Sequence, residues 1–356
     1  MKITKQRKTE HIRICLDEQV EIGDPLLDDV ALVHQALPEA DLESLDIAAE
    51  FLGKRLSFPL VIAGITGGCD EAREINRSLA RVAERCGIGF GVGSQRAMIE
   101  DASLADTYRV RDEAPGALVL GNVGITALRQ YAPERINEAL QAIGADGVCV
   151  HLNPAQEIFQ AEGDFDFSGC LDALEAFCGA AAVPVVAKEV GNGISRHCAL
   201  QLKQAGVSAI DVGGYGGTSW VIVDSIRSGL DADSYRSWGI PTAAAVLEAG
   251  VGLPLIATGG VRSGLQMAKA IALGADVCGI ALPFLKALDR GGEEAAGRYV
   301  ELLVADFRRA MFLTGCRNLA ELRSARVVLS GRLKAWQEQL PAAFVSAAAP
   351  RILTKS

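Results

Sequence analysis

Residues 147–157 read GVCVHLNPAQE, an apolar run that passes directly into an imidazole, two amides and a carboxylate. The apolar part is typical of a buried strand, and the polar part begins where that strand meets its loop. Burying so many polar groups at the end of a strand is costly unless a ligand binds them. We therefore expect this strand to end in a functional site.

The same alternation of a short apolar run and a longer amphipathic stretch occurs eight times between residue 59 and about residue 290. Like parallel strands covered on both faces, the runs are partly β-branched and lack strict polar alternation. They span residues 59–66, 88–93, 117–124, 147–153, 184–190, 209–214, 254–260 and 277–283. Because no run is an obvious polar edge strand, the pattern predicts an α/β fold, a closed (β/α)8 TIM barrel.

Helices are expected between the runs, for example at 195–204 and 263–273, each followed by a glycine that can end it. We expect one domain over 1–356, made of an N-terminal extension (1–58), the barrel (59–290) and a C-terminal extension (291–356) with a helix at 293–312. Residues 229–240 (GLDADSYRSWGI) form a polar insertion expected between the sixth strand and its helix. Either a mobile lid or a plain surface loop would explain it.

The chain has a net charge of −9 and a pI near 5.1, which argues against broad binding to nucleic acid or anionic membranes. Its nine cysteines include no CxxC pair, which favours reduced packing thiols over a zinc site. The N-terminus lacks the apolar core of a signal peptide, and no stretch approaches the roughly 18 apolar residues of a membrane helix. We expect a soluble, cytoplasmic protein.

Polar and glycine residues gather at the expected C-terminal ends of the strands, where barrel enzymes place their active sites. They are Thr66, Gly67, Gly68, Ser94, Arg96, Asn122, His151, Asn153, Gln156, Glu157, Lys188, Glu189, 213–218, Gly259, Gly260, Arg262, Ala281 and Leu282. Exposed amides after the seventh and eighth runs could bind a phosphate, although glycines also occur in turns merely to reverse the chain. Ser94, Asn122 and Thr66 could hydrogen-bond a flavin edge or serve as ordinary turn residues.

Two groups of cations have more than one explanation. Lys188 could stabilise the N1–C2 carbonyl region of a flavin, form a Schiff base, or make a rim salt bridge with Glu189 or Glu157. Arg7 and Lys8, close to His11, could clamp an anion over the barrel mouth with Arg96, or belong to a solvated tail.

Two oxidoreductase classes that use similar barrels fit poorly. A purine-nucleotide dehydrogenase would carry a nucleophilic cysteine after the glycine-rich loop of the sixth strand, and none is there. A hydroxy-acid oxidase would carry a base histidine near the end of the seventh strand, and none of the four histidines is near it.

With these residues assembled, the sequence resembles the type 2, flavin-dependent isopentenyl diphosphate isomerases over nearly its whole length. Each motif is moderately specific, and the ordered set is highly specific. The motifs are RK-x-x-H at 7–11, GITGG at 64–68, GSQR at 93–96, GNVG at 121–124, HLNPAQE at 151–157, KEVGNGIS at 188–195, GGTSW at 216–220, WGIPTA at 238–243, GGVRSG at 259–264, KAIALGAD at 269–276 and VVLSGRLKAW at 327–336.

The resemblance implies reduced FMN, Mg²⁺ and a diphosphate substrate. By this resemblance the flavin would be contacted by Thr66, Gly67, Gly68, Ser94, Asn122, Lys188 and Thr218, and its phosphate by Gly259, Gly260, Arg262, Ala281 and Leu282. The substrate site would comprise Arg7, Lys8, Arg96, His151, Asn153 and Gln156, the last three forming the catalytic set. Glu157 would bind Mg²⁺, which commonly takes few protein carboxylates and completes its shell with substrate oxygens and water.

The implied reaction converts isopentenyl to dimethylallyl diphosphate without net redox, with reduced FMN as general acid and base. Gln156 is too weak an acid for that part, so it is assigned to orientation or a proton relay. NADPH or NADH would serve only to reduce the flavin initially, and the family implies a homo-oligomer, a tetramer or octamer. Tyr215 in the sixth-strand loop and Val190 depart from the family pattern, which leaves fine flavin contacts open.

A flavin-binding barrel without catalysis is an alternative from another functional class. It would have no need for the diphosphate-binding set of Arg7, Lys8, Gln156 and Glu157, which favours the enzyme.

Overall fold

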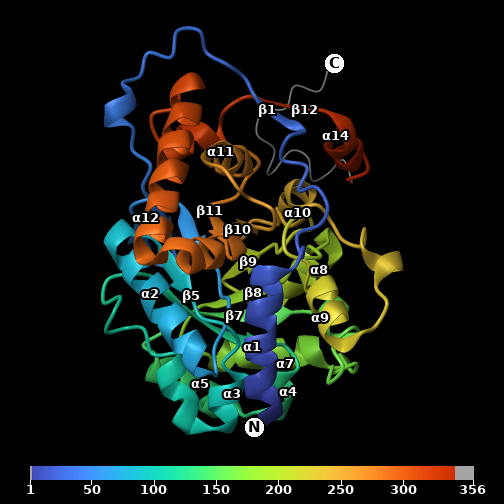
Figure 1. Cartoon of the computed structure of the whole chain (residues 1–356). Coiled ribbons are helices and arrows are strands. Elements are labelled where there is room, and N and C mark those ends of the chain that lie inside the picture. Colours follow the sequence, from blue (N-terminus) through green and yellow to red (C-terminus); the bar gives the residue numbers. More distant parts are fainter. Residues whose placement is uncertain (1, 341–356) are drawn as a thin grey trace.

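The barrel predicted from the sequence is confirmed by a computed structural model, which describes residues 2–340 (Figure 1). Eight parallel strands close into one barrel as β11 pairs with β4. They are β4 (Leu60–Ile62), β5 (Gly89–Gly91), β6 (Val119–Gly124), β7 (Gly147–Leu152), β8 (Val185–Glu189), β9 (Ala209–Asp211), β10 (Leu255–Thr258) and β11 (Val277–Ile280). Nearly every strand residue is buried, because helices cover the outside and side chains fill the inside.

Strand register decides which side chains meet at the C-terminal rim of the barrel. His151 on β7 is the partner of Lys188 on β8, and Lys188 is the partner of Asp211 on β9. Since residues in register on neighbouring parallel strands face the same side, these three polar side chains form one row. The motif that begins with His151 thus belongs to a continuous polar surface.

The helices around the barrel begin and end largely where the sequence predicted. Ser195 caps α8 and Ser263 caps α11, each accepting an N–H bond from the first turn of its helix. The helices after the strands are α2 (Asp70–Cys86), α3 (Arg96–Glu100), η2 (Ala102–Thr107), α4 (Ala127–Gln130), α5 (Pro133–Ala142), α6 (Pro154–Glu157), α7 (Cys170–Ala180), α8 (Arg196–Gln204), α9 (Trp220–Ser228), α10 (Thr242–Glu248), α11 (Gly264–Ala272) and α12 (Leu282–Leu313).

Several predicted runs extend past their strands, as 59–66 does past β4 and 209–214 past β9, and two predictions place residues in the wrong element. The eighth apolar run was expected to continue to residue 283, but Leu282 and Pro283 already belong to α12, because proline is well suited to a first helical turn. The segment 229–240 does not lie between the sixth strand and its helix. It lies between α9 and α10 and contains η3 (Asp233–Tyr235), because Ser219 starts α9 directly after the strand-six loop.

The two extensions of the chain meet each other and the barrel. In the N-terminal extension are α1 (Lys2–Asp17), β1 (Val30–Leu32), η1 (Leu42–Ser44), β2 (Ala49–Phe51) and β3 (Lys54–Leu56), and in the C-terminal one α13 (Leu319–Arg323), β12 (Val327–Leu329) and α14 (Gly331–Glu338). β1 pairs antiparallel with β12, and α1 lies across the barrel beside α9 (Figure 1). Of the predicted C-terminal extension, residues 341–356 lie outside the described residues. Between residues 2 and 340, no helix is both long enough and apolar enough to cross a bilayer.

Candidate active site

A pocket of about 200 Å³ lies at the C-terminal ends of the strands, with α1 along one side. Most residues predicted for the site line it, and they come from the N-terminal extension and from all parts of the barrel. The predicted residues on its wall are Arg7, Lys8, Thr66, Ser94, Arg96, Asn122, His151, Asn153, Gln156, Glu157, Lys188, Thr218, Gly259, Gly260, Arg262, Ala281 and Leu282. Gly67 and Gly68 do not line it. Gly67 packs on Tyr108, and the Gly68 N–H bonds Thr107 Oγ1 at 2.9 Å.

The wall formed by the loops after β4 and β5 contains an unused buried hydroxyl. Thr66 is only 2% exposed, and its Oγ1 has no hydrogen-bond partner among the described residues. The loop is held in place from behind, because Asn76 Nδ2 donates to the carbonyls of Thr66 (3.2 Å) and Thr107 (2.9 Å). A buried hydroxyl without a partner is costly, so this wall is suited to a ligand that completes the bond.

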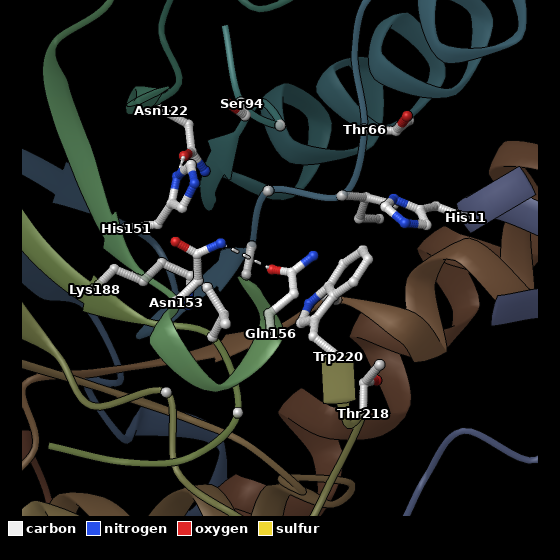
Figure 2. A pocket seen from close by; sticks show the side chains of 18 of the residues that line it. His11, Thr66, Ser94, Asn122, His151, Asn153, Gln156, Lys188, Thr218 and Trp220 are labelled. Carbon is white, nitrogen blue, oxygen red and sulfur yellow. Dashed lines mark hydrogen bonds between the residues drawn. The ribbon is translucent and has the colours of Figure 1, made fainter. Parts of the chain in front are cut away.

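Asn122 and His151 form a hydrogen-bonded pair on neighbouring strands (Figure 2). Nδ1 of His151 lies 2.7 Å from Asn122 Oδ1, so the imidazole donates through Nδ1 and leaves Nε2 as an acceptor. Burial, together with the nearby Lys8 and Lys188, lowers the pKa of His151 to about 3. The ring is therefore neutral across the physiological pH range.

The short helix α6 orients the carboxylate predicted to bind a metal. Asn153 Nδ2 donates to Glu157 Oε1 at 2.7 Å, and Oε2 accepts from Gln160 Nε2 at 3.2 Å and from the Asp164 N–H at 2.8 Å. Glu157 is thus fixed with Oε1 beside the Asn153 amide. No group of three or more His, Cys, Asp or Glu side chains suited to a metal occurs in residues 2–340.

Asp224 on α9 was not predicted, yet it connects two parts of the site. It is fully buried and accepts from His11 Nε2 (2.9 Å), Gln156 Nε2 (2.8 Å) and Arg227 Nε (3.0 Å). Burial alone would raise the pKa of Asp224, but these hydrogen bonds outweigh it and lower the pKa. Asp224 therefore fixes the Gln156 amide and attaches α1 to α9.

The side of the pocket formed by α1 is cationic. Arg7 Nε is buried with no hydrogen-bond partner in the described chain. Burial, and then the neighbouring Arg7, lowers the pKa of Lys8 to about 8. Trp220 also lines this side and packs edge-on against His11, with ring centroids 5.1 Å apart (Figure 2). Because Arg7 and Lys8 lie side by side with few acidic partners, this side of the pocket mouth is suited to bind an anion.

Lys188 and Arg96 each have an acidic partner. Of the three explanations considered for Lys188, the salt bridge to Glu189 or Glu157 is not formed, because its Nζ lies 2.8 Å from Asp211 Oδ2 instead. Arg96, at the pocket's edge, bonds Glu100 Oε1 at 2.8 Å and is about half exposed. Arg96 lines the pocket and so can add a third cation to Arg7 and Lys8.

The loops after β10 and β11 present backbone donors. The N–H groups of Gly259, Gly260 and Leu282, the first residue of α12, donate to no other group in residues 2–340. Gly260 has φ 70°, and a Cβ there would lie 2.1 Å from the carbonyl oxygen of Gly216. Only glycine permits this approach, which shapes a pocket edge suited to a phosphate. The Arg262 guanidinium pairs with Glu21 through Nε at 3.0 Å.

Comparisons with known proteins agree with this geometry. Residues 122–329 match the model of the FMN-dependent dehydrogenase family. The isopentenyl-diphosphate delta-isomerase of Archaeoglobus fulgidus is 48% identical, over 94% of this chain and 98% of the relative. The enzyme of the same name from Methanosarcina mazei is 46% identical, over 94% and 95%.

This chain belongs to the isopentenyl-diphosphate delta-isomerase family. The FMN-dependent model places it with the type 2, flavin-dependent isomerases, as the sequence motifs predicted. Solved structures of mandelate oxidase share the fold at low identity. One holding 3,3-difluoro-2-hydroxy-3-phenylpropionic acid has a TM-score of 0.63 at 18% identity, over 93% of this chain and 99% of that one. Another, with (S)-2-phenylpropionate, has a TM-score of 0.63 at 19% identity, over 92% and 98%.

Val190 and Tyr215, the two residues that depart from the family pattern, have different surroundings. Val190 lines the pocket. Tyr215 instead points away from it, because its hydroxyl donates to the Arg236 carbonyl at 2.9 Å in the 229–240 segment. The first departure can alter a ligand contact, whereas the second anchors that segment.

Proposed function

We propose that this protein converts isopentenyl diphosphate to dimethylallyl diphosphate, with bound reduced FMN and with Mg²⁺ on the diphosphate. The observation that supports this most directly is the division of one pocket into two parts. One part offers neutral donors and acceptors with free backbone amides, and the other offers Arg7 and Lys8 beside an oriented carboxylate. A flavin nucleotide suits the first part, and a metal diphosphate suits the second.

The residues present fit FMN. Thr66, whose hydroxyl has no partner, lines one cavity together with Asn122 and Lys188, and these polar groups match the mixed donors and acceptors of a flavin edge. The free amides of Gly259 and Gly260 and the N-terminus of α12 suit its phosphate. When bound, reduced FMN would supply an electron-rich ring and a nitrogen that can give and take a proton.

Mg²⁺ would depend on Glu157 and on the substrate itself. Oε1 of Glu157 accepts only from Asn153 as a strong bond, which leaves a lone pair for a metal. Residues 2–340 hold no group of three or more His, Cys, Asp or Glu side chains suited to a metal, so diphosphate oxygens and water would complete the shell, as Mg²⁺ tolerates well. We therefore expect Mg²⁺ to bind tightly only together with the diphosphate.

The protein's own side chains would bind and orient the substrate. Arg7 and Lys8 would neutralise the diphosphate, and neutral His151 would accept a hydrogen bond through Nε2 without adding charge. Gln156, fixed by Asp224, would hold the alkene end or a proton-carrying water in one orientation. Such preorganised groups favour a transition state in which one carbon gains a proton and another loses one.

Isomerisation and redox chemistry can be distinguished in one assay. Purified protein with FMN, Mg²⁺ and NADPH or NADH is expected to convert isopentenyl diphosphate and to leave hydroxy acids untouched. Replacing Arg7 and Lys8 by alanine should raise the KM for isopentenyl diphosphate while the visible spectrum of bound flavin stays unchanged. Oxidation of a hydroxy acid without isomerisation would refute the proposal, and an unaltered KM would remove the α1 cations from it.

A further inference from the structure

Strand β9 ends in an acid, Asp211, for which neither the motifs nor the proposed reaction has a use. Its side chain is 3% exposed and points into the barrel. With Lys188 it lines a small cavity that shares Asn122 and Thr258 with the main pocket, so it lies just beneath the pocket floor. Lys188 and Thr258 both line the two cavities and both contact Asp211, and Lys188 is the charged one of the two links between Asp211 and a ligand in the main pocket.

Asp211 is held in one orientation by three contacts. Oδ2 accepts from Lys188 Nζ at 2.8 Å, and Oδ1 accepts from the Thr258 hydroxyl and from the Gly213 N–H at 3.3 Å. Because β8, β9 and β10 are adjacent, the partners come from three consecutive strands. A lysine paired this way loses the rotamer freedom of its long side chain.

Glu189, the other acid next to Lys188, cannot replace Asp211. Successive strand residues point to opposite faces, so Glu189 faces away from Lys188. Its Oε2 instead accepts the backbone N–H groups of Val190 (2.7 Å), Gly191 (2.7 Å) and Gly193 (3.2 Å). Asp211 is therefore the carboxylate that balances the Lys188 ammonium, whose side chain is 12% exposed.

We propose that Asp211 is a positioning residue for Lys188: it fixes the ammonium against the flavin and offsets its charge, and so limits how strongly the site favours reduced over oxidised FMN. This role rests on the proposed binding of FMN in the pocket. An unbalanced lysine would attract the electron density that reduction adds to the flavin, and a balanced lysine attracts it less.

Two substitutions should shift the reduction potential of bound FMN in opposite directions. Asp211→Asn keeps the size of the side chain and removes its charge, so the potential should become more positive. The ratio of the dissociation constants of oxidised and reduced FMN should change about tenfold or more. For a two-electron couple this corresponds to a shift of about 30 mV. Lys188→Met should make the potential more negative, because it leaves Asp211 beside the flavin.

A matched control separates this effect from a loss of stability. Asp146, at the start of β7, is also a partly buried carboxylate paired with cations, at 2.7 Å from Arg111 and 3.2 Å from Lys54. Asp146→Asn should lower the melting temperature and leave the potential of bound FMN unchanged. If Asp211→Asn alone does not fold, the double variant with Lys188→Met removes the buried pair together. Its potential should lie above that of Lys188→Met.

The potentials are measured by equilibrium dye titration of the FMN-loaded proteins under anaerobic conditions. Wild-type protein that binds no FMN would refute the proposed function, and this role of Asp211 with it. If wild type binds FMN but the potential is unchanged in Asp211→Asn, or in the double variant relative to Lys188→Met, only the role of Asp211 is refuted. Shifts of the expected signs, absent in Asp146→Asn, would support it.

Discussion

Lys8 gives the sharpest pH prediction, because its ammonium is buried on α1 beside Arg7 with a pKa of about 8. Lysine is charged below its pKa, so substrate binding should be supported at neutral pH and lost as the pH rises through about 8. The relevant substitutions are Lys8→Arg, whose guanidinium stays charged to about pH 12, and Lys8→Gln, which is never charged. They are expected to change the pH profile in different ways.

The size of the effect follows from the titration. With a pKa of about 8, roughly nine-tenths of Lys8 is protonated at pH 7 and roughly one-tenth at pH 9. A charge-assisted hydrogen bond contributes about 1.5–3 kcal/mol, or roughly 10- to 150-fold in affinity. The value of kcat/KM should therefore fall about five- to tenfold between pH 7 and pH 9. In Lys8→Gln it should already be at least about tenfold lower at pH 7 and should be flat above it.

The assay is the anaerobic isomerisation of isopentenyl diphosphate by enzyme with reduced FMN, since kcat/KM reports the pKa values of free enzyme and free substrate. The last ionisation of the diphosphate should lie near that of other phosphate esters, roughly 6, and so affects only the acid side. Lys269→Arg is the control, because that partly buried lysine lies outside the pocket and pairs with Asp28. An alkaline decline that persists in Lys8→Arg would refute the assignment.

Three further predictions concern single residues of the pocket. Glu157→Gln should weaken Mg²⁺ activation about tenfold or more while FMN stays bound, and unchanged activation in a Mg²⁺ titration would remove Glu157 from the metal site. Thr66→Val should weaken FMN binding about 2- to 13-fold, which fluorescence titration measures. Because the hydroxyl has no partner in the FMN-free protein, the melting temperature of that form, measured by calorimetry, should not fall. The pKa of His151 is near 3 in the folded protein and about 6.5 in the unfolded chain, so its NMR signals should not titrate between pH 5 and 9. Its contribution to stability should fall as the pH drops from about 6.5 towards 3.

The sequence contains enough information for the barrel because parallel strands covered on both faces have a distinctive pattern. Runs such as 184–190 needed almost no adjustment, since β8 spans Val185–Glu189. The errors fall where a strand passes into the next element, as at Leu282, because apolar residues can continue into the first turn of a helix that packs on the barrel. The position of 229–240 was missed because α9 and α10 together occupy the connection after β9.

Most of the pocket was predictable because barrel topology brings the C-terminal strand ends together whatever the loop sequences. The residues that were not predicted are the acids Asp211 and Asp224 and the aromatic Trp220, whose roles depend on neighbours far apart in the chain. Asp224 lies in the mostly apolar helix α9, and only its contact with His11 reveals its function. Glu189 could have been removed from the alternative partners of Lys188, because neighbouring residues of a strand point to opposite faces. Asp211 could have been suspected as an acid inside a fully buried strand.

The flavin is proposed to work here without net redox turnover, and counting products per reducing equivalent tests this most directly. The FMN-loaded protein is photoreduced once under anaerobic conditions and given excess isopentenyl diphosphate and Mg²⁺, without NADPH or NADH. Many molecules of dimethylallyl diphosphate should form per flavin while the flavin spectrum remains that of the reduced state. Reoxidation of the flavin after a single product, or no isomerisation by the reduced protein, would contradict the account.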